Sequence, residues 1–271
     1  MDAVIALHKP PQRRVPAGMA AGLHARQQRS GGAAGQGVQG EAETRLFLRT
    51  TPQDLVAPGS RLVVVAPHPD DEILAVGGTV AALAAMAGRG HAVQVVAVTD
   101  GEGSHPHSPA WPRERLRHAR PQETLQALAS LGLAGADMLR LGLPDGAVAA
   151  HEKELAGMLP LRPDDTVFVT WRHDGHADHE ACARAALAAA RNVGARCIEC
   201  PVWALVPGHP AHARLRGRLM QRIALPPAMV RAKAEAMAAF GSQTCADGSR
   251  PPVLAAQALA TWRLPHEWAM A

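Results

Sequence analysis

The stretch V-V-V-A-P-H-P-D-D-E, from Val63 to Glu72, joins an apolar, β-branched run to a histidine and three acidic residues. The run predicts a buried strand over residues 61–66, and the two prolines that follow end it. From Ile73 the chain becomes alanine-rich and helix-like. The polar residues therefore lie on a strand-to-helix turn, which is where open α/β sheets bind their ligands.

Strands and helices alternate beyond this turn. Further strands are predicted over residues 92–99, 137–141, 166–170 and 195–201. Helices are predicted over residues 71–87, 112–131, 149–159, 181–192, 227–240 and 252–261. This alternation predicts an α/β fold with a mostly parallel sheet covered by helices. Residues 1–43, rich in Gly, Ala, Gln and Arg, are expected to form a flexible, disordered leader, and residues 44–271 a single domain.

Composition and charge argue against a nucleic-acid-binding protein and against a membrane-spanning one. The 271 residues carry a formal charge of +4, spread over scattered arginines, which argues against a nucleic-acid partner. The longest uncharged run, residues 73–88, is shorter than the roughly 20 residues of a membrane span, and no signal peptide is visible. A cytoplasmic protein with free cysteines is expected. The many alanine-rich helices are suited to packing between subunits of a homo-oligomer.

Polar clusters follow four of the predicted strands. They are His68–Glu72, Asp100–Ser104, Asp145 and His173–His179. The carboxyl ends of parallel strands share one edge of a sheet, so these segments are expected to converge on one pocket.

The residue types in this pocket suit a catalytic metal. A catalytic zinc typically takes three protein ligands and leaves one position open for water, and His68, Asp71 and His179 supply that set. Asp70 then lies beside the metal, where it can take a proton from a metal-activated water. His176 can stabilise the oxyanion and protonate the leaving amine, and Asp178 can fix an imidazole tautomer. Iron or cobalt would fit the same donors.

Simpler interpretations exist for each cluster alone. Asp70 or Asp71 can cap the following helix, a contribution of about 1 kcal/mol. The histidines between residues 173 and 179 can form a solvated loop. The two clusters together, each placed after a strand, favour the metal site.

These motifs resemble a known family. Pro67-His-Pro-Asp-Asp-Glu72 resembles the A-H-P-D-D-E signature of the PIG-L/LmbE-like zinc-dependent N-acetylglucosaminyl deacetylases, and His176-Ala-Asp-His179 resembles their H-x-D-H signature. Weaker similarity covers Thr99–Ser104, Arg120–Glu123, Leu143–Gly146 and Lys233–Gln243. The resemblance spans about residues 61–244.

The resemblance implies a Rossmann-like fold and the hydrolysis of an N-acetyl group from a GlcNAc-type amino sugar or its conjugate, with one Zn²⁺ per chain. By motif position, His68, Asp71 and His179 match the metal ligands, Asp70 the base and His176 the electrophilic histidine. Arg120 and Asp145 match positions that hold substrate hydroxyls. Some members place a tyrosine upstream of H-x-D-H; this chain has no tyrosine, and Asp174 stands near that position.

Other functions fit less well. A dinucleotide-binding protein would need a third glycine after Gly101-Glu-Gly103, where His105 and Pro106 stand instead. A metallophosphoesterase usually needs a second metal and more ligands than remain. A non-catalytic metal-binding homologue would have no need of Asp70, and a de-N-acylase acting on a non-sugar amide stays open as an alternative.

Overall fold

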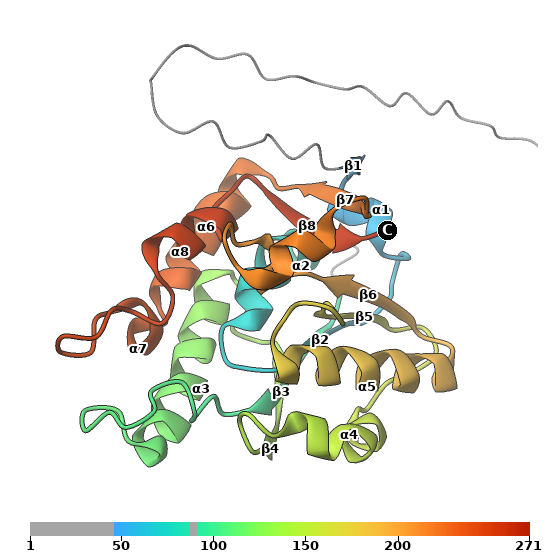
Figure 1. Cartoon of the computed structure of the whole chain (residues 1–271). Helices are drawn as coiled ribbons and strands as arrows, with labels where there is room; N and C mark the ends of the chain where they lie inside the picture. Colours follow the sequence, from blue (N-terminus) through green and yellow to red (C-terminus); the bar gives the residue numbers. More distant parts are fainter. Residues whose placement is uncertain (1–45, 87–90) are drawn as a thin grey trace, which may run out of the picture. The chain divides into compact units, whose positions relative to one another are not determined.

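Five parallel strands in the order β4-β3-β2-β5-β6 form the main sheet of the computed structural model, which describes residues 46–86 and 91–271 (Figure 1). The strands are β2 (Leu62–Ala66), β3 (Val93–Thr99), β4 (Asp137–Leu143), β5 (Thr166–Thr170) and β6 (Arg196–Cys200). This arrangement confirms the predicted α/β fold with a mostly parallel sheet. The predicted leader, residues 1–43, lies outside the described residues, and the division into a leader and one domain stays a prediction.

Helices connect the strands and cover the sheet on both faces. The α-helices are α1 (Pro52–Leu55), α2 (Asp71–Ala84), α3 (Arg113–Ser130), α4 (Glu152–Met158), α5 (Ala177–Val193), α6 (Pro227–Ala238), α7 (Gly241–Thr244) and α8 (Ala256–Trp262). Three short 3₁₀ helices are η1 (Val148–His151), η2 (Trp203–Leu205) and η3 (Pro210–Leu215). The predicted helix over 149–159 is therefore a 3₁₀ turn that continues into α4.

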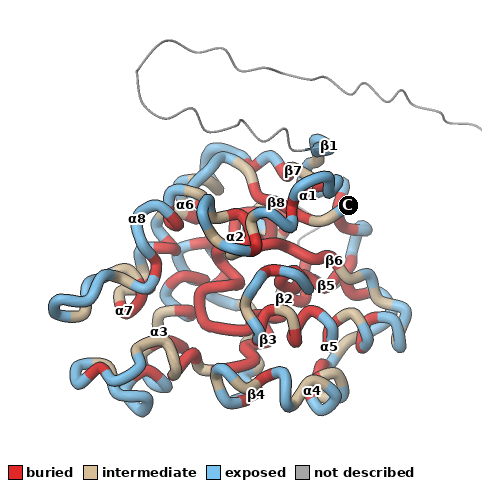
Figure 2. Tube along the Cα trace, viewed as in Figure 1, coloured by how far each residue is buried: buried red, intermediate tan, exposed pale blue. Residues whose placement is uncertain are grey.

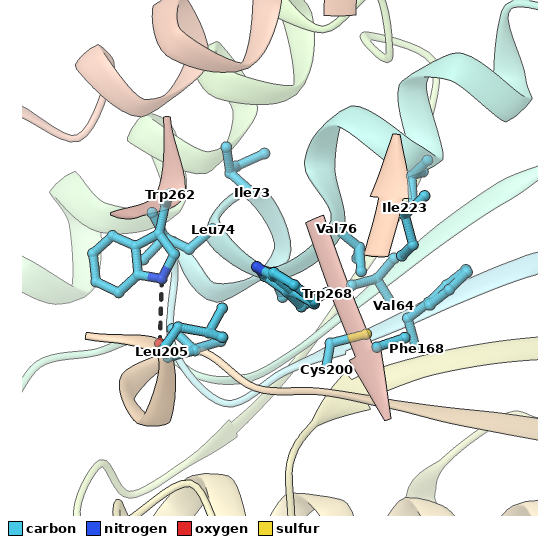
Figure 3. Close-up of a cluster of buried hydrophobic side chains, with 14 of the residues drawn as sticks. Val64, Ile73, Leu74, Val76, Phe168, Cys200, Leu205, Ile223, Trp262 and Trp268 are labelled. Carbon is cyan, nitrogen blue, oxygen red and sulfur yellow. Dashed lines mark hydrogen bonds between the residues drawn. The ribbon is translucent and has the colours of Figure 1, made fainter. Parts of the chain in front are cut away.

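Strand residues alternate between two hydrophobic cores, one on each face of the sheet. Figure 2 shows that the central strands β2 and β3 are buried. Val64 and Phe168 belong to the core that contains α2, α3, α6 and α8, where Trp262 and Trp268 lie among them (Figure 3). Val63 and Val65 belong to the opposite core, which contains α4 and the alanine-rich face of α5. Because successive side chains of a strand point to opposite faces, a strand buried on both sides needs an unbroken apolar run.

A second, three-stranded sheet was not predicted. Its order is β1-β7-β8, with β1 (Leu46–Thr50) parallel to β7 (Leu219–Ala224) and β8 (His266–Met270) antiparallel to it. These strands are five or six residues long and mix polar with apolar residues. Patterns this short do not separate a strand from a loop.

Helix α5 begins earlier than predicted, at Ala177 instead of Ala181. The sequence prediction treated the polar residues before Ala181 as a loop. In the structure His176 is the N-cap and its Nδ1 accepts a hydrogen bond from the Asp178 N–H, which satisfies a free donor of the first turn. His179 therefore lies inside the helix.

A buried ion pair ties α2 to the C-terminal part of the chain. Lys233 Nζ lies 2.6 Å from Glu267 Oε1 and also donates to the Leu74 carbonyl oxygen. The same carboxylate accepts the N–H groups of Gly78 and Thr79 at 2.9 Å each. The pair thus holds α2, whose first residue is Asp71, against α6 and β8.

The sequence also made predictions about membrane-spanning helices and about the cysteines. Among them, no helix combines the length and the apolar character required to cross a membrane. All four cysteines are free: Cys182 and Cys200 are buried, Cys197 is half-buried and Cys245 is exposed. The prediction of free thiols is confirmed.

Candidate metal centre and active site

The candidate site lies at the carboxyl ends of β2 and β5. From β2 the chain crosses over to β3, which pairs with one edge of β2. β5 pairs with the other edge of β2 and is followed by β6, so the crossover direction reverses between β2 and β5. That reversal opens the crevice where doubly wound sheets bind ligands. The turn after β2 carries His68, Asp70 and Asp71, and the turn after β5 carries Asp174 and His176 and leads into α5.

Asp71 is at the centre of the site. Its Oδ2 lies 3.2 Å from His68 Nδ1 and 3.1 Å from His179 Nε2, although these two histidines are 111 residues apart in sequence, between β2 and α5. All three residues are buried, and His179 has no exposed surface. The three predicted ligands therefore place one oxygen and two nitrogens side by side.

Each of these two imidazoles has a carboxylate at its other ring nitrogen. His68 Nε2 lies 3.1 Å from Asp145 Oδ1 and 3.2 Å from Asp178 Oδ2. His179 Nδ1 lies 2.8 Å from Asp174 Oδ2. A carboxylate on one nitrogen fixes the ring orientation and makes the other nitrogen a better metal ligand.

These supporting carboxylates are held by backbone N–H groups of distant loops. Asp174 accepts from Val202, Trp203 and Ala204 at 2.9–3.0 Å, at the start of η2. Asp178 accepts from Gly146 at 2.7 Å and from Val148 at 3.1 Å. Asp145 accepts from Gly103 at 2.7 Å. The loops after β3, β4 and β6 thereby fix the histidines that follow β2 and β5.

The donor set fits a divalent metal. Within the described part of the chain, the buried His179 Nε2 has no hydrogen-bond partner, although Asp71 Oδ2 lies 3.1 Å from it. A ring nitrogen left without a partner inside a protein is unusual, and a cation between it and the carboxylate would satisfy both. Two other sets of residues, His68 with His176 and His179 and His68 with Asp145 and Asp178, have one possible ligand atom each within 4.8 Å of one another.

His176 lies at the edge of this cluster. Its ring centroid is 4.8 Å from those of both His68 and His179. Burial, reinforced by the two neighbouring imidazoles, lowers the pKa of His176 to about 4. Its Nδ1 accepts the Asp178 N–H, so the neutral ring carries its proton on Nε2.

Asp70 occupies an unusual backbone conformation at the start of α2. Its φ is 131° and ψ is −31°, and its Oδ2 accepts a hydrogen bond from Arg120 Nη2 at 3.0 Å. Burial raises the pKa of Asp70 to about 7, although the positive charge of Arg120 opposes the shift. The neighbouring Asp71 has a lowered pKa, because the attraction of His179 and His68 outweighs its burial.

Of the three residues predicted to bind substrate, Arg120 and Asp174 are buried and Asp145 is half-buried. Arg120 is 3% exposed, Asp174 is 0% exposed and the Asp145 side chain is 10% exposed. Their polar atoms contact other residues of the site: Asp70 for Arg120, His179 for Asp174 and His68 for Asp145. Substrate binding by these three residues stays a prediction.

Sequence reasoning gave Glu72 no role. In the structure its Oε2 accepts the Asp70 N–H at 3.1 Å, and the buried Oε1 has no hydrogen-bond partner among the described residues. Burial, followed by repulsion from Asp70, raises the pKa of Glu72 to about 8. The sequence indicated a role for Glu72 only through its place in the motif. Its contact with the Asp70 N–H depends on the unusual backbone conformation of Asp70, which the sequence does not show.

The fold and the site together define a class of protein: a Rossmann-like α/β domain with a buried histidine–aspartate centre at the switch point of its sheet. The PIG-L family, described as GlcNAc-PI de-N-acetylase, matches residues 63–190, which run from β2 into α5 and contain every predicted metal ligand. This match covers a little under half of the chain, so the segment from β2 into α5 is similar to the PIG-L family.

One related protein is the 1D-myo-inositol 2-acetamido-2-deoxy-alpha-D-glucopyranoside deacetylase 1 of Catenulispora acidiphila. It is 32% identical over 117 residues, which are 42% of this chain and 34% of that protein. The chain thus spans about a third of the length of this curated relative.

Solved structures share the fold. A conserved protein from Thermus thermophilus is 26% identical, with a TM-score of 0.52 over 75% of this chain and 84% of that one. The zinc-inhibited form of teicoplanin deacetylase is 20% identical, with a TM-score of 0.51 over 68% of this chain and 85% of that one. These likenesses support an LmbE-like fold.

Proposed function

We propose that the protein is a zinc-dependent hydrolase that removes an N-acetyl group from a GlcNAc-type amino sugar or its conjugate. The observation that carries the proposal is the convergence of His68 Nδ1 and His179 Nε2 on Asp71 Oδ2, with a carboxylate behind each imidazole. The match of residues 63–190 to the PIG-L family and the deacetylase activity named for the relative in Catenulispora acidiphila support the choice of reaction.

In this proposal His68, Asp71 and His179 hold the metal. A bound Zn²⁺ supplies a Lewis acid that polarises the amide carbonyl and lowers the pKa of water. Asp70 takes the proton of the attacking water, and that proton is returned to the leaving nitrogen, so that amide and water give acetate and amine. His176 donates its Nε2–H to the developing oxyanion.

Asp178, Asp174 and Asp145 support these groups. Asp178 and Asp145 keep the proton of His68 on Nε2, so that Nδ1 presents a lone pair towards Asp71. Asp174 does the same for His179 through Nδ1. We assign Asp174 to this orienting role, because both of its oxygens are used and none of its surface is exposed.

The function is tested by measuring metal content together with amine release from a panel of N-acetylated substrates. The panel contains N-acetylglucosamine, its α-glycosides including an inositol conjugate, and simple non-sugar acetamides. We expect about one zinc per chain and chelator-sensitive amine release from at least one sugar. Release only from the non-sugar amides would replace the sugar assignment, and a protein that binds no metal would contradict the proposal.

Asp174→Asn should weaken metal binding by about 10–100-fold, the usual effect of losing a carboxylate behind a ligand imidazole. The new amide NH₂ would also face the backbone donors of Val202 and Ala204. The measurement is a zinc competition titration, with thermal unfolding followed in parallel. Asp164→Asn, at an exposed aspartate, is the matched control. Unchanged zinc affinity with a raised KM would instead make Asp174 a substrate-binding residue.

A further inference from the structure

Arg120 makes contacts that hold Asp70 in place. Its Nη2 donates to the Asp70 carboxylate at 3.0 Å and to the Pro69 carbonyl oxygen at 2.6 Å. Its Nη1 donates to the Gly101 carbonyl oxygen at 2.7 Å. The guanidinium therefore joins the turn after β2 to the turn after β3. Both N–H groups of Nη2 are used, while the buried Nε has no hydrogen-bond partner in the described part of the chain.

The turn after β3 closes tightly on this guanidinium. Gly101 has a φ of 66°, which L residues with a side chain rarely adopt. A Cβ at this position would lie 1.9 Å from Arg120 Nη1. The close approach of backbone and guanidinium leaves the arginine 3% exposed. A substrate hydroxyl would have to reach a group that is already enclosed by the protein.

Asp70 needs such support because its backbone is strained. A non-glycine residue at φ 131° lies outside the common regions, and such a strained conformation persists only where the surrounding structure imposes it. Three contacts impose it here: Glu72 accepts the Asp70 N–H, while Arg120 binds both the Asp70 side chain and the preceding carbonyl group. Within residues 46–86 and 91–271, the hydrogen bonds to this carboxylate reach Oδ2 and leave Oδ1 for a water molecule.

We propose that Arg120 is a positioning residue that fixes the strained Asp70 so that Oδ1 faces the attacking water. The inference rests on the proposed function, in which Asp70 is the base. Arg120 acts through Asp70, so its contribution should disappear when Asp70 can no longer accept a proton. A residue that holds substrate would keep its contribution in that background.

The test is a double-mutant cycle of Arg120→Gln and Asp70→Asn, assayed by amine release from the N-acetylglucosaminyl glycoside that the wild-type enzyme turns over fastest. Arg120→Gln alone should lower kcat by about 10²-fold, the scale expected when a reacting group is misplaced by about 1 Å. KM should change by less than about threefold, and zinc content should remain as in the wild type. In the Asp70→Asn background, Arg120→Gln should lower kcat by less than about threefold.

Arg117→Gln is the matched control, because this arginine lies on the same helix, its side chain is 47% exposed and it pairs with Glu102. It should keep wild-type kcat and KM. Arg120→Lys is the second variant in case the glutamine variant does not fold. An ammonium group cannot form the same planar fork, so the charge-keeping variant should still lose kcat.

The outcomes separate the inference from the function on which it rests. Multiplicative losses in the cycle, or a raised KM with intact kcat in Arg120→Gln, would overturn the positioning role and favour substrate binding. Wild-type turnover in Asp70→Asn alone would remove the base from the proposed function, whatever Arg120 does. A loss confined to zinc content or thermal stability, with kcat per bound zinc unchanged, would make Arg120 merely structural and also overturn the inference.

Discussion

Asp70→Asn should retain zinc and lose about 10²–10⁴-fold in kcat, the range that general-base catalysis contributes. The amide has nearly the same shape as the carboxylate but cannot accept the proton of the attacking water. Asp71, the adjacent residue that contacts both histidines, is unchanged by this substitution. Steady-state amine release and metal analysis on the same preparation give the two readouts.

Asp100→Asn is a suitable control for this variant. Asp100 also follows a central strand, β3, but its carboxylate pairs with Arg140 at 2.7 Å. Within the described residues, this carboxylate makes no hydrogen bond to the histidine cluster. We expect wild-type turnover from it. If Asp70→Asn also turned over like the wild type, Asp70 would not be the base. If it lost its zinc, Asp70 would have to be counted among the metal ligands.

His179→Ala should reduce zinc content from about one per chain to near zero. The substitution removes a ligand nitrogen and leaves two buried carboxylates, Asp71 and Asp174, without the imidazole that lies between them. Binding to two remaining protein ligands is far weaker than to three. Zinc analysis after gel filtration measures the loss, and circular dichroism shows whether the variant is folded.

Two further variants make this result specific. His173→Ala alters an exposed histidine of the same turn, which packs its ring on Trp171, and should keep full zinc content. His176→Ala should keep zinc but lose turnover, which distinguishes the predicted ligand set from the one formed by His68, His176 and His179. Full zinc content in His179→Ala would reject the ligand assignment.

The main sheet was predictable because its strands are unbroken apolar runs. The bounds predicted for the strand at residues 166–170 are those of β5. The prediction placed the start of α5 four residues late, since the polar first turn of that helix resembles a loop in sequence. The second sheet was missed because its strands pair across long sequence separations, as β1 does with β7, and carry little local pattern.

The sequence by itself determined the types of residue at the site and the turns that carry them. His68, Asp70 and Asp71 are adjacent in the chain, and a parallel sheet brings the turn after β5 to the same edge. The local spacing of the motif and the alternation of strands and helices were enough for this part of the prediction.

Only the tertiary structure decided what each polar group contacts. Asp174 binds backbone groups 28–30 residues further on, Asp178 binds groups 30–32 residues earlier, and Arg120 reaches a carboxylate 50 residues before it. A hydrogen bond depends on distances of a few tenths of an ångström and on direction, and loop packing sets both. Spacing in the sequence therefore could not distinguish a residue that binds substrate from one that orients a neighbour.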